Sequence, residues 1–217
     1  MKVRMEFTYR TPKGAEMTCF SEEMKVPKAL LLTEDLERTG RLKKITYVDK
    51  HDTTWSMKEL QRHIEELKTE VHDIILYFDG GFDPETNQSG LGCVLYYKQN
   101  NKSFRLRKNA LVEELKTNNE AEYAALHLAL QELHSLEAHH IPITIIGDSN
   151  VVINQLRGEW PCYEFELSRW ADRIDAKLEK LGMEPEYVLV SRNKNKEADQ
   201  LASQALRKIE VVSTKEI

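Results

Sequence analysis

The 217-residue chain contains only three cysteines, Cys19, Cys93 and Cys162. Their number is odd and no two form a C-x-x-C pair, which argues against both a disulfide framework and a zinc knuckle. A reducing compartment is the simplest interpretation, and we expect the protein to be cytoplasmic.

Long hydrophobic runs are also missing. The longest uninterrupted apolar stretches have only a few residues, far short of the ~18 that suggest a membrane span. The first ten residues, MKVRMEFTYR, contain no apolar segment of the kind found in secretory signals. We therefore expect a soluble protein that is not exported.

An excess of basic residues is absent as well. The chain has 31 Lys and Arg against 36 Asp and Glu, a formal net charge of −5, which argues against nucleic-acid binding through a basic coat alone. Residues 1–72 are almost neutral, with 14 basic and 13 acidic side chains, whereas residues 73–217 carry 17 and 23. The excess of carboxylates therefore belongs to the second part of the chain.

The first 72 residues have the pattern of a small α+β module. Two alternating segments joined by TPKG predict a β-hairpin, and the stretch VPKALLLTEDLERTGR predicts a helix with Pro27 in its first turn. LKKITYVD predicts a strand, and Ser56 with Glu59 forms a capping-box pattern before the apolar stripe of Leu60, Ile64 and Leu67. No chemistry is evident here, and the role of this module stays open between substrate binding and contact with a protein partner.

Residues 73–210 predict a larger α/β domain, followed by a C-terminal tail at 211–217. The expected order is three strands, a helix, a strand, two helices, a strand and a final helix. In chain order the segments are HDIILYFDGG, SGLGCVLYY, SFRLRKNALV, TNNEAEYAALHLALQELHSLEAHH, IPITIIGD, SNVVINQL, YEFELSRWADRIDAKLEKLG, EYVLV and NKEADQLASQALRKIE. This order implies a mixed sheet with helices on its faces.

Four carboxylates of this domain stand where apolar side chains are expected. Asp79 and Asp148 each end an apolar strand, and ligands gather at the carboxyl ends of strands in α/β sheets. Glu122 continues the core-facing stripe of its helix, and Asp199 shares a face with apolar residues of the last helix. One such residue is explained by helix capping, but four on separate elements indicate a cluster that cations must neutralise. Oxygen ligands favour Mg²⁺ or Mn²⁺ over zinc.

The motifs YFDGG, TNNEAEY, IIGDSNVV and NKEADQLA, in this order, resemble the four signature motifs of type 1 ribonuclease H domains over about residues 73–209. The resemblance implies a five-stranded mixed sheet flanked by helices. It implies an acidic tetrad of Asp79, Glu122, Asp148 and Asp199, with Glu122 rather than Glu120 as the matching glutamate. Two Mg²⁺ ions, with Mn²⁺ as a possible substitute, would be held there to cut the RNA strand of an RNA/DNA hybrid, leaving 3′-hydroxyl and 5′-phosphate ends.

The resemblance also implies residues that bind the hybrid. Thr117 would contact a phosphate of the DNA strand, while Asn118, Asn119 and Asn150 would reach base edges and sugar hydroxyls in the minor groove. The residues TNN alone are equally typical of a loop and helix N-cap, and both interpretations can hold together.

The chain departs from the family pattern in two places. Many members have a histidine shortly before the last aspartate, whereas this chain has VLVSRNKNKEAD, in which Arg192 is the nearest candidate. Arginine cannot act as a base at ordinary pH but can hold a phosphate, so slower turnover or an altered pH profile is expected. The segment LRGEWPCYEFELSRW lacks a lysine-rich protrusion, which leaves Arg105 and Arg107 as a modest basic strand face that serves either phosphate contact or solubility.

The sequence leaves two functions of different classes open. The complete tetrad favours a metal-dependent hybrid endonuclease. The missing histidine and the acidic pI favour the alternative, a catalytically weak or inactive nucleic-acid-binding or adaptor protein on the same scaffold.

Overall fold

The computed structural model describes the backbone of residues 1–217 and all side chains except those of residues 66–68. The chain divides into two compact units, Met1–Leu67 and Lys68–Ile217. The side chain of Leu67, the last member of the predicted apolar stripe, lies outside the described residues. No helix in the described part of the chain is long and apolar enough to cross a membrane.

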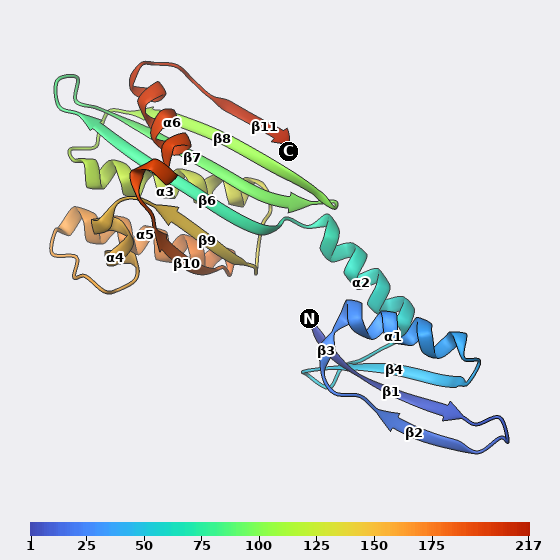
Figure 1. Ribbon diagram of the computed structural model, residues 1–217. Helices are drawn as coiled ribbons and strands as arrows, with labels where there is room; N and C mark the ends of the chain where they lie inside the picture. The colour runs from blue at the N-terminus through green and yellow to red at the C-terminus, as the bar shows by residue number, and fades with distance from the viewer. The chain divides into compact units, whose positions relative to one another are not determined.

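The first unit is a small α+β fold (Figure 1). The hairpin of β1 (Lys2–Arg10) and β2 (Glu16–Phe20), helix α1 (Val26–Arg38) and strand β4 (Leu42–Asp49) confirm the predicted elements. β1 lies between β2 and β4, and two short strands complete the sheet, β3 (Met24–Lys25) on β1 and β5 (Thr54–Trp55) on β4.

The first unit also confirms the predicted capping box. The Ser56 N–H donates to Glu59 Oε2 (2.8 Å) and the Glu59 N–H donates to Ser56 Oγ (3.3 Å), at the start of α2 (Met57–Thr69). The buried core of the unit consists of Val3, Met5, Val26, Ala29, Tyr47 and Leu60.

The second unit contains a mixed six-stranded sheet in the order β10-β9-β6-β7-β8-β11. β6, β9 and β10 are parallel, while β6, β7, β8 and β11 form antiparallel pairs. The bounds are β6 (His72–Asp83), β7 (Gln88–Gln99), β8 (Lys102–Val112), β9 (Pro142–Gly147), β10 (Glu184–Leu189) and β11 (Val212–Glu216).

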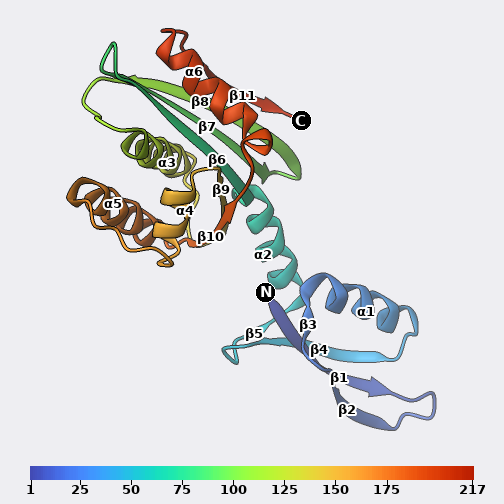
Figure 2. The ribbon, with the colours of Figure 1, turned by 60° about the vertical axis from the view of Figure 1, so that its left-hand side comes forward.

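Helices cover both faces of this sheet, as Figures 1 and 2 show. Helix α6 lies on one face, and α3 and α5 lie on the other. The helices are α3 (Asn118–Ser135), α4 (Asn150–Leu156), α5 (Phe165–Leu181), the short 3-10 turn η1 (Arg192–Lys194) and α6 (Lys196–Leu206). The mixed sheet with helices on both faces confirms the predicted fold class.

The sheet differs from the expected five strands at its edge. Residues 211–217 were predicted as a tail, but Val212–Glu216 form β11, which pairs antiparallel with β8 from Val212 opposite Lys108 to Glu216 opposite Phe104. The unpaired edge of β8 offers free backbone donors and acceptors, and these residues satisfy them. The short terminal segment therefore extends the sheet beyond the strands that the motifs define.

Candidate metal centre and active site

The sheet register brings two of the four carboxylates together. Parallel strands β6 and β9 pair with Tyr77 opposite Ile146, so Asp79 and Asp148, each two residues further on, lie side by side just past this pairing. Asp148 follows the end of β9, whereas Asp79 lies within β6, which continues to Asp83, and not at its end as the sequence predicted. Asp79 is 9% exposed.

Glu122 comes to this pair from α3 because a glycine allows the helix to approach the sheet. A Cβ atom at Gly80 would overlap the backbone of Ala121 and Glu122, so only glycine permits this packing. Glu122 Oε2 is buried and has no hydrogen-bond partner among the described residues. The Glu120 side chain instead bonds to the backbone just before the helix, where its Oε2 accepts the Lys116 N–H at 3.3 Å.

One oxygen from each of Asp79, Glu122 and Asp148 lies within 4.8 Å of the others. They line a cavity of about 320 Å³, whose walls include Asp199 and Arg192. The Arg192 guanidinium donates to Asp199 Oδ1 from Nη2 (2.6 Å) and Nε (3.1 Å). The fourth predicted carboxylate therefore lies in the same cavity, paired with an arginine.

The electrostatics of the cavity favour a bound cation. Burial and the nearby charges of Asp148 and Asp199 raise the pKa of Asp79 to about 7. Burial and the charges of Asp79 and Asp148 raise the pKa of the Glu122 carboxyl well above its usual range. Clustered carboxylates have this property when no cation offsets their repulsion.

The donor set of the cavity fits a hard divalent cation. Every candidate ligand is a carboxylate oxygen, without histidine or cysteine, which suits Mg²⁺ or Mn²⁺ better than zinc. Glu122 Oε2, which has no hydrogen-bond partner among the described residues, is available for such a bond. The cluster is thus compatible with metal binding.

The predicted substrate-binding residues lie at two helix starts beside the cavity. Thr117 caps α3, where its side chain accepts the Glu120 N–H at 3.1 Å, and Asn119 is half-buried in the same turn. Asn118 lines the cavity, and its Oδ1 accepts the Phe82 N–H at 2.8 Å. Asn150 is exposed at the start of α4. The cap interpretation of Thr117 is confirmed, and the substrate contacts stay predictions.

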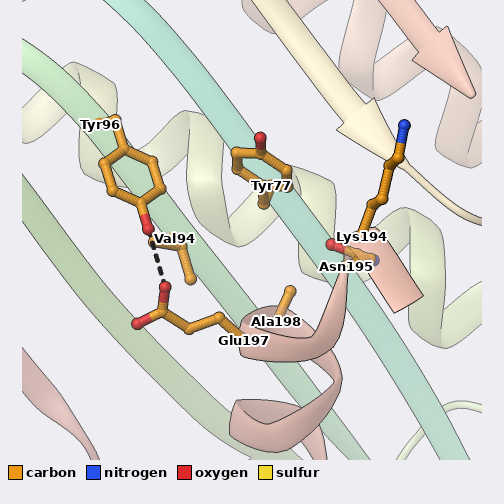
Figure 3. A pocket seen from close by; sticks show the side chains of 7 residues that line it. All are labelled: Tyr77, Val94, Tyr96, Lys194, Asn195, Glu197 and Ala198. Carbon is orange, nitrogen blue, oxygen red and sulfur yellow. Dashed lines mark hydrogen bonds between the residues drawn. The ribbon is translucent and has the colours of Figure 1, made fainter. Parts of the chain in front are cut away.

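The two arginines of β8 are paired within the protein. Arg105 Nη1 lies 3.2 Å and Arg107 Nε 3.1 Å from Glu197 Oε1, and the Tyr96 hydroxyl donates to Glu197 Oε2 at 2.8 Å. Figure 3 shows the Tyr96 bond to Glu197 across a pocket of about 180 Å³. These arginines therefore anchor the first turn of α6 and are not a free phosphate-binding face.

Asn195 was not predicted from the sequence, although it contacts the site directly. Its Nδ2 donates to Asp148 Oδ1 at 2.6 Å, and its side chain is buried. The only sequence signal is its position four residues before Asp199, which puts both on one side of a helical turn.

Known proteins share this fold and much of this sequence. Residues 77–205 match a family model described as reverse transcriptase-like. The chain is 42% identical over 207 residues to the uncharacterized protein YpeP of Bacillus subtilis (strain 168), and the match covers 95% of this chain and 91% of that protein.

Solved structures of RNase H1 are also similar. RNase H1 from the halophilic archaeon Halobacterium salinarum NRC-1 is 28% identical, with 62% of this chain and 98% of that chain covered and a TM-score of 0.53. LC11-RNase H1, solved in complex with an RNA/DNA hybrid, is 27% identical, with 63% and 98% covered and a TM-score of 0.56.

These similarities define the class of the second unit as an RNase H-like domain, a fold that supports a hydrolase of the nuclease type. The resemblance to type 1 ribonuclease H is thereby confirmed at the level of the family. The chain belongs to the reverse transcriptase-like family.

Proposed function

We propose that the protein is a metal-dependent endonuclease that hydrolyses the RNA strand of RNA/DNA hybrids. The observation that carries this proposal is the meeting of Asp79, Glu122 and Asp148 oxygens within 4.8 Å inside an RNase H-like fold. The hybrid bound to LC11-RNase H1 supports the choice of substrate.

Four carboxylates would hold the cations. Asp79 lies within β6 and Asp148 directly follows the neighbouring strand β9, and both would be the central ligands, while Glu122 and Asp199 would approach from α3 and α6. When bound, two such ions would supply activation of an attacking water and stabilisation of the leaving 3′ oxygen. The carboxylates must be ionised to bind them, so the raised pKa values of Asp79 and Glu122 make cation binding stronger as pH rises.

The neighbouring residues would orient the hybrid. Asn118 lies on the cavity wall, and Thr117, Asn119 and Asn150 lie at helix starts beside it, where the helix N-terminus favours phosphate oxygens. Arg192 is exposed and can move from Asp199 to a substrate phosphate, a contact that needs no proton transfer.

The experiment is cleavage of one labelled sequence as RNA/DNA hybrid, single-stranded RNA, RNA duplex and DNA duplex, in Mg²⁺ and in Mn²⁺. We expect cleavage of the hybrid alone, in its RNA strand, with 3′-hydroxyl and 5′-phosphate ends. Asp148→Asn should abolish it, and Asp172→Asn, an exposed carboxylate on α5, should not. Binding of the hybrid by folded protein without cleavage in either metal would support the adaptor function instead.

A further inference from the structure

A single buried asparagine joins three of the elements that carry the carboxylates. Asn195 follows η1 and directly precedes α6, and it is 1% exposed. Figure 3 shows it between Lys194 and the first turn of α6, at the edge of the pocket that Tyr77 and Tyr96 also line.

The contacts of Asn195 are with the carboxylate-bearing residues of these elements or with their immediate neighbours. Its Nδ2 donates to the Phe78 carbonyl (2.9 Å), one residue before Asp79, and to Asp148 Oδ1 (2.6 Å). Its backbone carbonyl accepts the Asp199 N–H at 3.1 Å. One residue thus contacts β6, the end of β9 and the first turn of α6.

These contacts are not those of an ordinary helix cap. Asparagine before a helix commonly accepts a backbone N–H of the first turn, but the Asn195 side chain forms no such bond. Both hydrogens of its amide are used on β6 and Asp148 instead. The Asn195 side chain therefore stabilises the residues around the cavity and leaves the first turn of α6 without a side-chain cap.

The first turn of α6 is fixed independently from the sheet below. Glu197, two residues further on, is held by the Tyr96 hydroxyl and by Arg105 and Arg107. These contacts tie the first turn of α6 to β7 and β8. Asn195 therefore connects Phe78 of β6 and Asp148 to a helix start that Glu197 holds on the sheet.

We propose that Asn195 is a positioning residue that holds Asp148 and the part of β6 around Phe78 and Asp79 in the geometry required for cation binding, and so sets the affinity of the site for divalent cations. The Asn195 amide is neutral, so it stabilises the Asp148 carboxylate without adding a charge that would repel the cation. A carboxylate has two oxygens, so one can be held by Asn195 while the other stays available to the ion. This inference rests on the proposed metal-dependent function.

The test measures Mn²⁺ binding by calorimetry, together with thermal unfolding of the metal-free protein, for Asn195→Ala in the full-length chain. Asn109→Ala is the matched control, because Asn109 is also buried and its Nδ2 donates to the carbonyls of Leu201 (3.0 Å) and Ile209 (2.9 Å). Both variants should unfold at lower temperature. Only Asn195→Ala should bind Mn²⁺ more weakly, by about 10-fold or more, as for other residues that orient a metal ligand.

Asn195→Ser is the variant to measure if the alanine variant does not fold, because a hydroxyl can still donate one hydrogen bond. Its Mn²⁺ affinity should lie between those of the wild type and of a variant without a donor. An affinity equal to the wild type in folded Asn195→Ala or Asn195→Ser, or an equal loss in Asn109→Ala, would overturn the positioning role and leave the proposed hydrolysis intact. Absence of Mn²⁺ binding by the wild type would overturn both.

Discussion

The buried carboxylates of the cavity are costly for the metal-free protein. Asp79 lies within β6 close to Asp148 and Asp199, with Arg192 as the nearby cation, and its charge also acts on Glu122. A carboxyl whose pKa is raised on folding keeps its proton where the unfolded chain has lost it. The stability of the metal-free protein is therefore linked to pH through this residue.

The variant Asp79→Asn should test this linkage. Because the pKa of Asp79 rises from 3.8 to about 7 on folding, the Asp79 carboxyl lowers the free energy of unfolding progressively as pH rises from about 4 to about 7. Above about pH 7 this destabilisation stays constant. In EDTA, the free energy of unfolding of Asp79→Asn should equal that of the wild type near pH 4 and exceed it by about 1–4 kcal/mol at pH 8. Urea unfolding at both pH values measures this, and parallel curves for the two proteins would contradict it.

Arg192 lines the cavity beside Asp199, and its removal should slow turnover. The guanidinium cannot take a proton but can hold a phosphate, so Arg192→Ala should lower kcat by ~10-fold, less than the loss of a buried donor would cause because Arg192 is exposed. Arg169→Ala, another exposed arginine paired within its own helix, is the control. An unchanged rate and pH profile in Arg192→Ala would exclude a role in the reaction.

The sequence indicated the carboxylates of the cavity more readily than the residues that support them. Asp79, Glu122 and Asp148 interrupt apolar patterns, and such interruptions are visible without a structure. Asn195 interrupts none, since it lies in the polar stretch RNKNKEAD. Its importance comes from contacts with Phe78 and Asp148, which are distant in the chain and become evident only in the fold.

At the scale of elements, glycines determine how closely the helices approach the sheet. A Cβ atom at Gly90 or Gly92 of β7 would overlap backbone carbonyl groups of α6, whereas one at Gly81 would meet only the Leu206 side chain, at 3.7 Å. Asp199 and Asn195 depend on this close packing because they lie at the start of α6.

The variant Gly92→Ala should therefore displace α6. Insertion of a methyl group against a backbone carbonyl cannot be relieved by a rotamer change, so we expect a loss of about 2–4 kcal/mol in the free energy of unfolding together with weaker Mn²⁺ binding. Gly81→Ala should cost less than about 1 kcal/mol, because its neighbour is a flexible side chain. Urea denaturation compares the two variants, and equal stabilities would show that the helix position tolerates the change.

The order of helices and strands could be predicted from hydrophobic periodicity, but the edge strand β11 could not. β9 is a largely apolar strand, and β6 contains the apolar run of residues 74–78, which made both strands predictable. The residues of β11 are mostly exposed, so their strand conformation depends on the free edge of β8. A strand that is stabilised by its partner rather than by burial carries little local signal.

At the scale of the whole chain, each compact unit has its own buried core. The carboxylates and the polar residues around them all belong to Lys68–Ile217. The first 72 residues are nearly neutral, so they offer little excess charge for binding phosphate groups.

Residues 68–217 alone should therefore fold and retain hydrolysis. We expect kcat within about threefold of the full chain, and a salt dependence of hybrid binding with the same slope, because the number of phosphate contacts is unchanged. Circular dichroism and binding titrations at several salt concentrations measure this. A shallower slope after removal of residues 1–67 would assign part of the hybrid contact to the first unit.

The most direct test of the central claim is the rate of hybrid cleavage in Mg²⁺ for four single variants, Asp79→Asn, Glu122→Gln, Asp148→Asn and Asp199→Asn. If the four carboxylates form one metal centre, each variant should bind the hybrid but cleave it at least ~100-fold more slowly than the wild type, since each removes a charged ligand. Cleavage that persists at the wild-type rate in Asp79→Asn or Asp148→Asn would contradict catalysis at this site.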